Sequence, residues 1–201
     1  MKIYLFIIFC IITIFSFVSC NLFSTRNPEE PNTGGTIVEP PSTPEILISN
    51  LIKSFQKKNA ENYISCLSYS GRIDNSQFEF IPSAEANSRY SSIFSLWDIS
   101  SEHRAFISLA SCFTVGNSPQ VIFSHEVYDR SIPDSIIFVA DYYLTAAHGK
   151  SNIPTIFSGR VQMTISKNAM GLLRIKRWID TSKENDTIQN TWSILKAQFN
   201  N

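Results

Sequence analysis

The hydrophobic pattern of this chain changes its period once, near Pro119, and this change limits the fold more than any other feature. Before Pro119, apolar residues recur with helical spacing, as they do over residues 47–55. After it, apolar and polar residues alternate, as over residues 136–144, which is typical of strands. Helices followed by consecutive strands predict an α+β fold, with N-terminal helices packed on a curved antiparallel sheet and a C-terminal helix.

The expected elements follow from the same patterns. Ser42 and Glu45 match a capping box, Asn59 is expected to cap a second, short helix, and Asp98 to cap the helix that runs to about Phe113. Ser166–Gly171 is a predicted hairpin turn, and a further turn is expected at 70–72. Helices are expected over 45–58, 59–67, 90–97, 98–113 and 188–199, and strands over 78–80 (an edge strand that ends before Pro82), 121–127, 136–144, 156–165 and 172–180.

Strict alternation in the last strand places Leu173, Ile175 and Ile179 on one face. Trp178 then belongs to the opposite row, among charged residues. An aromatic side chain in such a row either packs under the terminal helix, which we favour, or forms part of a contact surface.

The N-terminus has the features of an export signal. Met1 and Lys2 form a short positive region, and Ile3–Val18 follows with sixteen uncharged residues. As a helix this stretch would span ~24 Å at ~1.5 Å per residue, short of the ~30 Å membrane core. The pattern therefore predicts a signal peptide over residues 1–19.

Phe17-Val18-Ser19-Cys20 resembles a bacterial lipobox, with Phe17 where leucine is usual. The resemblance implies that Cys20 becomes the lipidated N-terminus of the mature protein. By similarity to enterobacterial sorting, Asn21 favours the outer membrane if the organism has one. An ordinary signal peptide cut nearby and an uncleaved anchor are the alternatives.

Residues 20–44 differ in composition from the rest of the chain. They are rich in Pro, Asn, Thr and Glu, and contain Gly34-Gly35 but few apolar residues. This composition predicts a flexible tether between the lipid and a single domain over 45–201, the alternative being an ordered arm that lies on the domain. Seventeen basic residues balance seventeen acidic ones, so no nucleic-acid partner is indicated.

The element order resembles the nuclear transport factor 2-like (NTF2-like) fold, also known as the SnoaL or ketosteroid-isomerase cone. Residues 59–68, the Phe94–Asp98 segment and the Trp192–Lys196 segment carry the resemblance, in the manner of bacterial lipoproteins with such domains. The resemblance implies helices on a curved sheet that encloses a pocket. It extends over residues 45–201.

The cysteines and histidines give no metal or thiol-enzyme signature. Cys66 and Cys112 both lie in apolar helical stripes, so either a disulfide or two buried free thiols is expected. His103, His125 and His148 are not spaced as metal ligands. We expect no metal and no cofactor.

The family resemblance implies a second hypothesis, an enzyme that uses a carboxylate base and tyrosine donors in the cone pocket. The candidate pocket residues are Asp141, Tyr142, Tyr143 and Trp178, with Arg160 or Arg177 as charged partners. Tyr142 lies in the apolar row, whereas Asp141 lies in the other row. The simpler interpretation, which we favour, is a cross-strand pair of Asp141 and Arg160 with the tyrosines in packing roles.

We therefore expect a non-catalytic, membrane-tethered module of the cell envelope that binds an envelope protein or a small apolar ligand. An isomerase, hydratase or hydrolase-like enzyme of the ketosteroid-isomerase type, acting on a small apolar substrate, is the alternative. Self-association through the sheet, giving a homodimer, is a third hypothesis. The sequence names no ligand.

Overall fold

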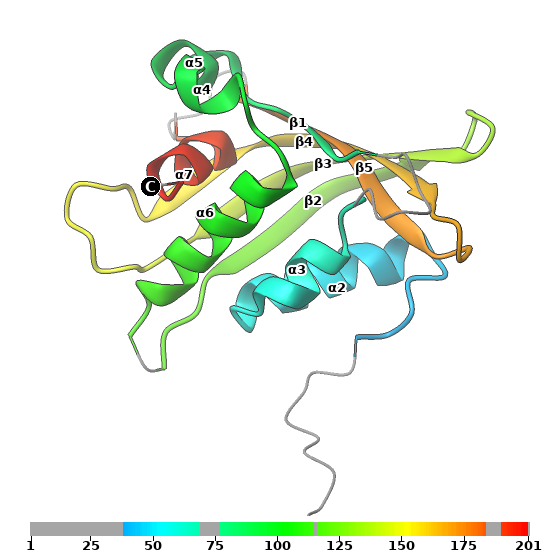
Figure 1. Cartoon of the computed structure of the whole chain (residues 1–201), viewed down its shortest axis with the longest axis horizontal. Helices are drawn as coiled ribbons and strands as arrows, with labels where there is room; N and C mark the ends of the chain where they lie inside the picture. The colour runs from blue at the N-terminus through cyan, green and yellow to red at the C-terminus, as the bar shows by residue number, and fades with distance from the viewer. Residues whose placement is uncertain (1–37, 69–76, 115, 184–189, 201) are drawn as a thin grey trace, which may run out of the picture. The chain divides into compact units, whose positions relative to one another are not determined.

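The computed structural model describes residues 38–68, 77–114, 116–183 and 190–200 (Figure 1). The predicted signal peptide, Cys20, the tether up to residue 37 and the predicted turn at 70–72 lie outside the described residues. No helix in the described ranges is long and apolar enough to cross a membrane.

A five-stranded sheet with the order β1-β5-β4-β3-β2 forms one layer of the domain. The strands are β1 (Glu79–Ile81), β2 (Gln120–Asp129), β3 (Ser135–Thr145), β4 (Ile156–Lys167) and β5 (Leu173–Thr181). Strands β2 to β5 are antiparallel neighbours joined in sequence order. β1 is an edge strand, as predicted, but it runs parallel to β5. Because β1 reaches β5 through a long connection and not a hairpin, no tight turn imposes the antiparallel direction.

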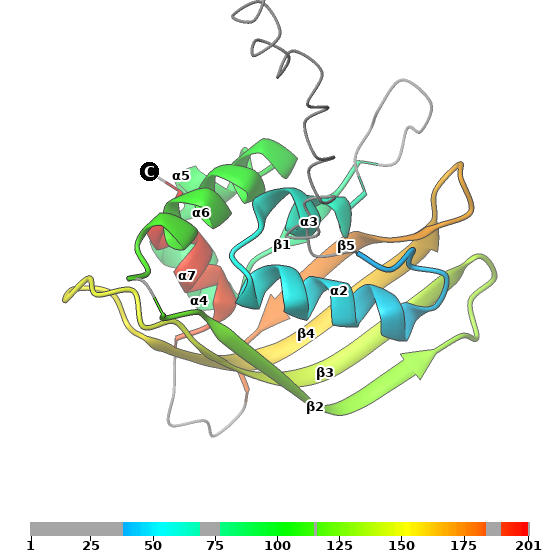
Figure 2. The same ribbon diagram turned by 90° about the horizontal axis from the view of Figure 1, so that it is seen from below.

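Helices cover one face of this curved sheet (Figures 1 and 2). They are α2 (Pro44–Gln56), α3 (Ala60–Ser65), α4 (Ala84–Arg89), α5 (Ser91–Phe94), α6 (Ile99–Ser111) and α7 (Trp192–Gln198). Asn59 and Asp98 cap α3 and α6 as predicted, each accepting a backbone N–H three residues on. The predicted α+β architecture is therefore confirmed.

The cap of α2 differs by one residue from the prediction. Thr43, not Ser42, is the N-cap, and its hydroxyl accepts the backbone N–H of Ile46 at 3.3 Å. Pro44 explains the shift, because proline suits the first helical position and disfavours helical geometry in the residue before it.

The chain before α2 packs on the domain. The Pro41 carbonyl accepts a hydrogen bond from the Leu173 N–H at 2.9 Å, and Asn50 Nδ2 donates to the Glu39 carbonyl at 2.7 Å. The domain thus includes residues that we had placed in the tether, and residues 39–44 follow the ordered-arm alternative. Pro41, the 66–68 segment and β1 share the outer edge of β5, so that edge is covered.

A β-bulge in β5 changes which side chains face the core. Ile175 pairs with Ile165 and Arg177 with Thr164, which leaves Lys176 as an extra residue. As a result Trp178 and Asp180 are buried, whereas Ile179 is only partly buried. The predicted facing of β5 is wrong beyond Ile175, because a single extra residue inverts the alternation.

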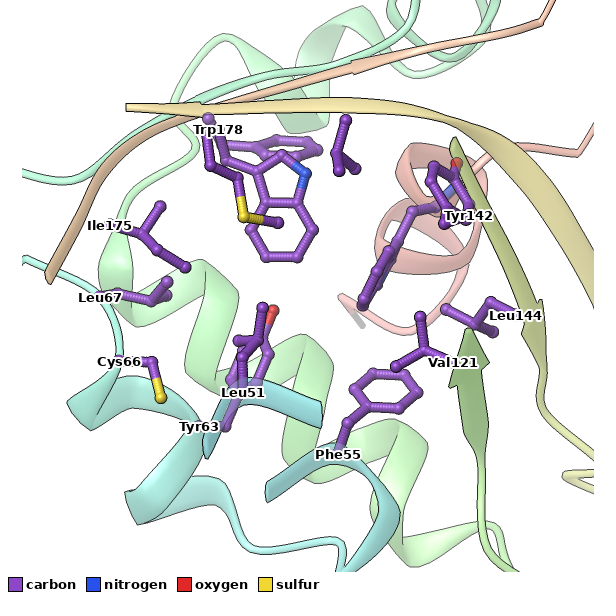
Figure 3. Close-up of a cluster of buried hydrophobic side chains, with 14 of the residues drawn as sticks. Leu51, Phe55, Tyr63, Cys66, Leu67, Val121, Tyr142, Leu144, Ile175 and Trp178 are labelled. Carbon is purple, nitrogen blue, oxygen red and sulfur yellow. The ribbon is translucent and has the colours of Figure 1, made fainter. Parts of the chain in front are cut away.

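The core lies between the helices and the concave face of the sheet (Figure 3). Figure 3 shows Trp178 directed from the sheet toward Leu51 and Tyr63 of the helices, with Tyr142 and Phe55 in the same cluster. Each of these five side chains is at most 2% exposed. Gly159 permits the closest packing, because a Cβ there would meet Thr181 O at 2.5 Å and Tyr142 Oη at 2.6 Å.

Candidate functional site

The C-terminal helix α7 lies inside the domain, against the concave side of the sheet. Every residue from Thr191 to Ala197 is buried, as is Phe199. Trp192 packs edge-on against Trp178 and Phe55, with ring centroids 4.8 and 5.2 Å apart. Trp178 therefore packs under the terminal helix, as the favoured interpretation of the sequence held.

A first buried polar network fixes the start of α7. Tyr142 Oη donates to Asp180 Oδ1 at 2.8 Å and accepts the Trp192 N–H at 2.7 Å. Asp180 Oδ2 accepts both the backbone N–H and the hydroxyl of Ser193. Burial raises the pKa of Asp180, although these hydrogen bonds oppose the rise. Both carboxylate oxygens of Asp180 are occupied by groups of the protein itself.

A second buried network surrounds Glu102 of α6. Tyr63 Oη donates to Glu102 Oε1 at 2.5 Å, and Trp97 Nε1 donates to Oε2 at 2.8 Å. Lys196 Nζ of α7 lies 2.7 Å from Glu102 Oε1, and 3.7 and 4.1 Å from the ring centroids of Phe80 and Trp178. Burial lowers the pKa of Lys196, while Glu102 opposes that change. The lysine is thus held between a carboxylate and two aromatic faces.

Little empty space remains beside these networks. A cavity lined by Tyr63, Glu102, Trp192 and Lys196, together with apolar side chains, offers about 20 Å³ to the centre of a water-sized sphere. A single water needs ~10–15 Å³ by this measure. The cavity therefore holds about one water and no substrate-sized molecule.

Solved structures of other proteins superpose on this domain. A candidate scytalone dehydratase from Novosphingobium aromaticivorans superposes with a TM-score of 0.52 and 10% identity, over 74% of this chain and 89% of that one. A candidate calcium/calmodulin-dependent protein kinase II association domain from Xanthomonas campestris gives 0.50 and 10%, over 71% and 86%. An NTF2-like superfamily protein from Salmonella enterica gives 0.47 and 12%, over 72% and 92%.

The domain has the NTF2-like fold. At these identities the likeness concerns the fold alone. Comparison with protein-family models and with curated proteins gives no match. In this NTF2-like domain α7 occupies the space between the sheet and the other helices.

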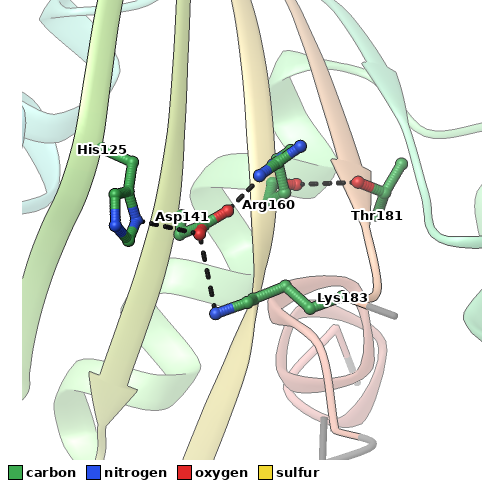
Figure 4. Close-up of polar contacts among 5 residues, drawn as sticks. All are labelled: His125, Asp141, Arg160, Thr181 and Lys183. Atoms are coloured by element: carbon green, nitrogen blue, oxygen red, sulfur yellow. Dashed lines mark hydrogen bonds and ion pairs between the residues drawn. The ribbon is translucent and has the colours of Figure 1, made fainter. Parts of the chain in front are cut away.

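The outer, convex face of the NTF2-like sheet carries a separate polar cluster around Asp141 (Figure 4). Arg160 Nε donates to Asp141 Oδ1 at 2.8 Å, and His125 Nδ1 and Lys183 Nζ lie 3.2 and 3.5 Å from Oδ2. Burial opposes ionisation of Asp141, but the hydrogen bond and charge of Arg160, followed by Lys183, outweigh it and lower the carboxyl pKa. The predicted cross-strand pair of Asp141 and Arg160 is present, since the two residues are direct register partners.

The four candidate pocket residues do not form one site. Tyr142 and Trp178 face the interior, whereas Asp141 and Tyr143 lie on the outer face, where Tyr143 is exposed. Arg177 pairs with Glu79 of β1 at 3.0 Å, away from both clusters. Adjacent residues on a strand point to opposite faces, which separates Asp141 from Tyr142.

Cys66 and Cys112 are free thiols in the structure, so the disulfide alternative is not found. Each thiol donates to the backbone carbonyl four residues earlier, that of Asn62 or Ser108. Burial raises the pKa of Cys66 to about 12, so it is an unreactive core residue.

The described part of the chain has no group of three or more His, Cys, Asp or Glu residues that could hold a metal ion. His103 lies 3.5 Å from Glu61, and His148 is buried, with Nε2 3.0 Å from the Pro154 carbonyl. The three histidines thus lie in separate surroundings.

Sequence reasoning missed Glu102, Lys196 and Ser193 as interior groups. Glu102 and Lys196 are charged residues of amphipathic segments, which ordinarily face solvent. The sequence signal for their burial is closeness to large apolar residues. Glu102 follows Trp97 by five residues, and Lys196 lies between Leu195 and Phe199, which are both buried.

Proposed function

We propose that this protein is a non-catalytic, membrane-anchored lipoprotein of the bacterial cell envelope whose NTF2-like domain acts through its outer surface on an envelope partner. One observation carries the proposal: the interior is filled by the protein's own helix α7. The lipidated Cys20 would join the domain to the membrane through the segment before residue 38.

Space is the first argument against internal chemistry. Pockets for small molecules usually measure ~300–1,000 Å³. The cavity beside Glu102 and Lys196 offers only about 20 Å³. A substrate could reach these groups only if α7, with its buried Trp192 and Leu195, left the core.

Chemistry is the second argument. A general base must lie within hydrogen-bond reach of the proton that it takes from the substrate. In this domain Asp180 and Glu102 each have both carboxylate oxygens engaged by donors of the protein. These carboxylates are suited to holding α7 in place.

Ligand binding tests the closed interior. We expect the melting temperature of the full-length protein in non-ionic detergent to be unchanged by indole and by steroids. Trp192→Gly should lose about 3–5 kcal/mol of stability. Indole should then restore roughly 5 °C or more by filling the vacated space.

The control is Trp97→Gly, which removes a half-buried indole and should not respond to indole. Saturable stabilisation of the wild-type protein by an apolar ligand would contradict the proposal. That result would favour the alternative of an enzyme of the ketosteroid-isomerase type, which requires an accessible pocket.

The anchor is tested by mass spectrometry of the protein expressed in a bacterial host. The wild-type chain should begin at Cys20 and carry acyl chains. The Cys20→Ser variant should carry no lipid and should no longer be found in the membrane fraction. The Cys112→Ser variant should remain lipidated and membrane-bound. A wild-type protein without acyl groups would refute this part of the proposal.

A further inference from the structure

The outer-face basic cluster, defined as His125, Arg160 and Lys183, gathers more positive than negative charge at one point of the sheet. All three side chains converge on Asp141, the one carboxylate that they contact within the described part of the chain (Figure 4). Among the described residues, Arg160 and Lys183 leave one positive charge in excess after Asp141 is neutralised. Asp141 is only 8% exposed, whereas Arg160 is 56% exposed. The carboxylate therefore lies beneath the cations, and the cations face solvent.

Arg160 has hydrogen-bonding capacity to spare. Its Nε is used by Asp141, and its two Nη groups contact no acceptor among the described residues. A hollow of about 430 Å³ adjoins the cluster and is lined by Arg160, Thr181, Ser182 and Lys183. Thr181 Oγ1 lies 3.2 Å from the Arg160 carbonyl, which ties this edge of the hollow to β4.

A β-bulge in β2 directs the His125 side chain toward the cluster. The register of β2 shifts between Ser124 and Val127, and His125 within this bulge has a φ of 52°. Positive φ is costly for a residue other than glycine, and bulges commonly redirect side chains. Here the bulge brings Nδ1 of His125 to 3.2 Å from Asp141 Oδ2.

We propose that this hollow binds a phosphate-type oxyanion. The Nη groups of Arg160 form a fork that can bind two oxygens, the Lys183 ammonium supplies a charge, and the Ser182 hydroxyl adds a donor. A tetrahedral anion has enough oxygens to use all of them, whereas a carboxylate has two. Asp141 is a positioning residue, which holds the Arg160 side chain in one orientation.

The proposal is tested by titrating the full-length protein in non-ionic detergent with inorganic phosphate at constant ionic strength, monitored by calorimetry. Saturable binding is expected. Arg160→Met and Lys183→Met should each weaken it about tenfold or more, because each removes a charge-assisted contact. Arg177→Met, which removes an exposed arginine paired elsewhere on the sheet, should leave the affinity unchanged.

A second arm distinguishes the source of the phosphate. Dihexanoyl-phosphatidylglycerol, added below its micelle concentration, tests a lipid headgroup, and acetate tests a simple carboxylate. Tighter binding of the lipid identifies a headgroup site, and tighter binding of inorganic phosphate identifies a free phosphate or phosphomonoester site. Either result supports the proposal if the Arg160→Met variant loses binding of the compound concerned.

Three results would overturn the proposal: no saturable binding of either phosphate compound, acetate binding as tight as phosphate, or an equal loss of affinity in Arg177→Met. Arg160→Lys guards against a folding defect, because it keeps the charge and removes only the fork. It should bind more weakly than the wild type and more tightly than Arg160→Met. The closed interior plays no part in these measurements, so the two proposals can fail separately.

Discussion

Asp180 and Asp141 show how the surroundings of a carboxyl group set its pKa in this domain. Asp180 is fully buried in the core, and burial raises its pKa. Asp141 lies under Arg160 and Lys183 on the outer face, and these cations lower its pKa. The same side chain therefore works in one place as a polar anchor for α7 and in the other as the centre of a charge cluster.

Asp141→Asn should reduce stability at pH 7 by about 0.5–1 kcal/mol, a small value because the partner cations are exposed and screened. A carboxyl whose folded pKa is lowered stabilises fully above its unfolded pKa, near 3.9, and loses this contribution as pH falls through the folded value. The difference between wild type and variant should thus shrink as the pH falls below about 4. Urea unfolding across this range measures it, and a difference independent of pH would contradict the account.

Gly159→Ala should destabilise the domain by about 3 kcal/mol through overpacking. The added Cβ would lie 2.6 Å from Tyr142 Oη and would displace the hydroxyl that joins Asp180 to the Trp192 N–H. Thermal unfolding monitored by tryptophan fluorescence measures the loss. Gly171→Ala, at a hairpin residue with φ of 76° and open space around it, should cost less. Equal costs would show that the contact with Tyr142 is not decisive.

At the scale of elements, the β5 bulge shows where prediction from the sequence stops. The long strands and the helices α2 and α6 followed to within a few residues from hydrophobic period and caps, because those signals are local. Helix α4 was not predicted, and the helix expected over 90–97 is shortened to α5. The inward orientation of Trp178 and Asp180 could not be predicted. It depends on the extra residue Lys176, and the bulge at Lys176 is stabilised by the packing of Trp178 against α7, which no local pattern reveals. The pairing of Lys196 with Glu102 was out of reach for the same reason.

Deletion of Lys176 should therefore be tolerated, at a cost of about 1–2 kcal/mol, since it makes β5 regular and keeps Trp178 and Asp180 facing inward. Deletion of Ile179 leaves Trp178 in place but turns Asp180 outward, so the hydrogen bonds to Tyr142 and Ser193 are lost. That variant should fail to fold cooperatively. Urea unfolding of the two variants tests this, and similar behaviour of both would refute the role assigned to the bulge.

At the scale of the whole domain, the sequence predicted the α+β layers and the NTF2-like resemblance, but not that the terminal helix fills the interior. The apolar stripe of Trp192, Leu195 and Phe199 indicated a packed helix without indicating where it packs. Two polar networks and the edge-on contact of the Trp178 and Trp192 indoles make α7 a structural part of the core. On the function proposed above, the outer face, with the exposed Tyr143 and the cluster around Asp141, is the surface that contacts other molecules.

Hydrogen exchange of the α7 backbone amides tests this account most directly. If α7 is an integral part of the core, the amides of Leu195 and Ala197 should exchange only through global unfolding. Their free energies of exchange should then agree within about 1 kcal/mol with those of the central strands β3 and β4. Exchange of α7 at a free energy several kcal/mol lower would show that the helix leaves the core while the sheet stays folded. In that case the interior opens, and the closed, non-catalytic domain proposed here would be wrong.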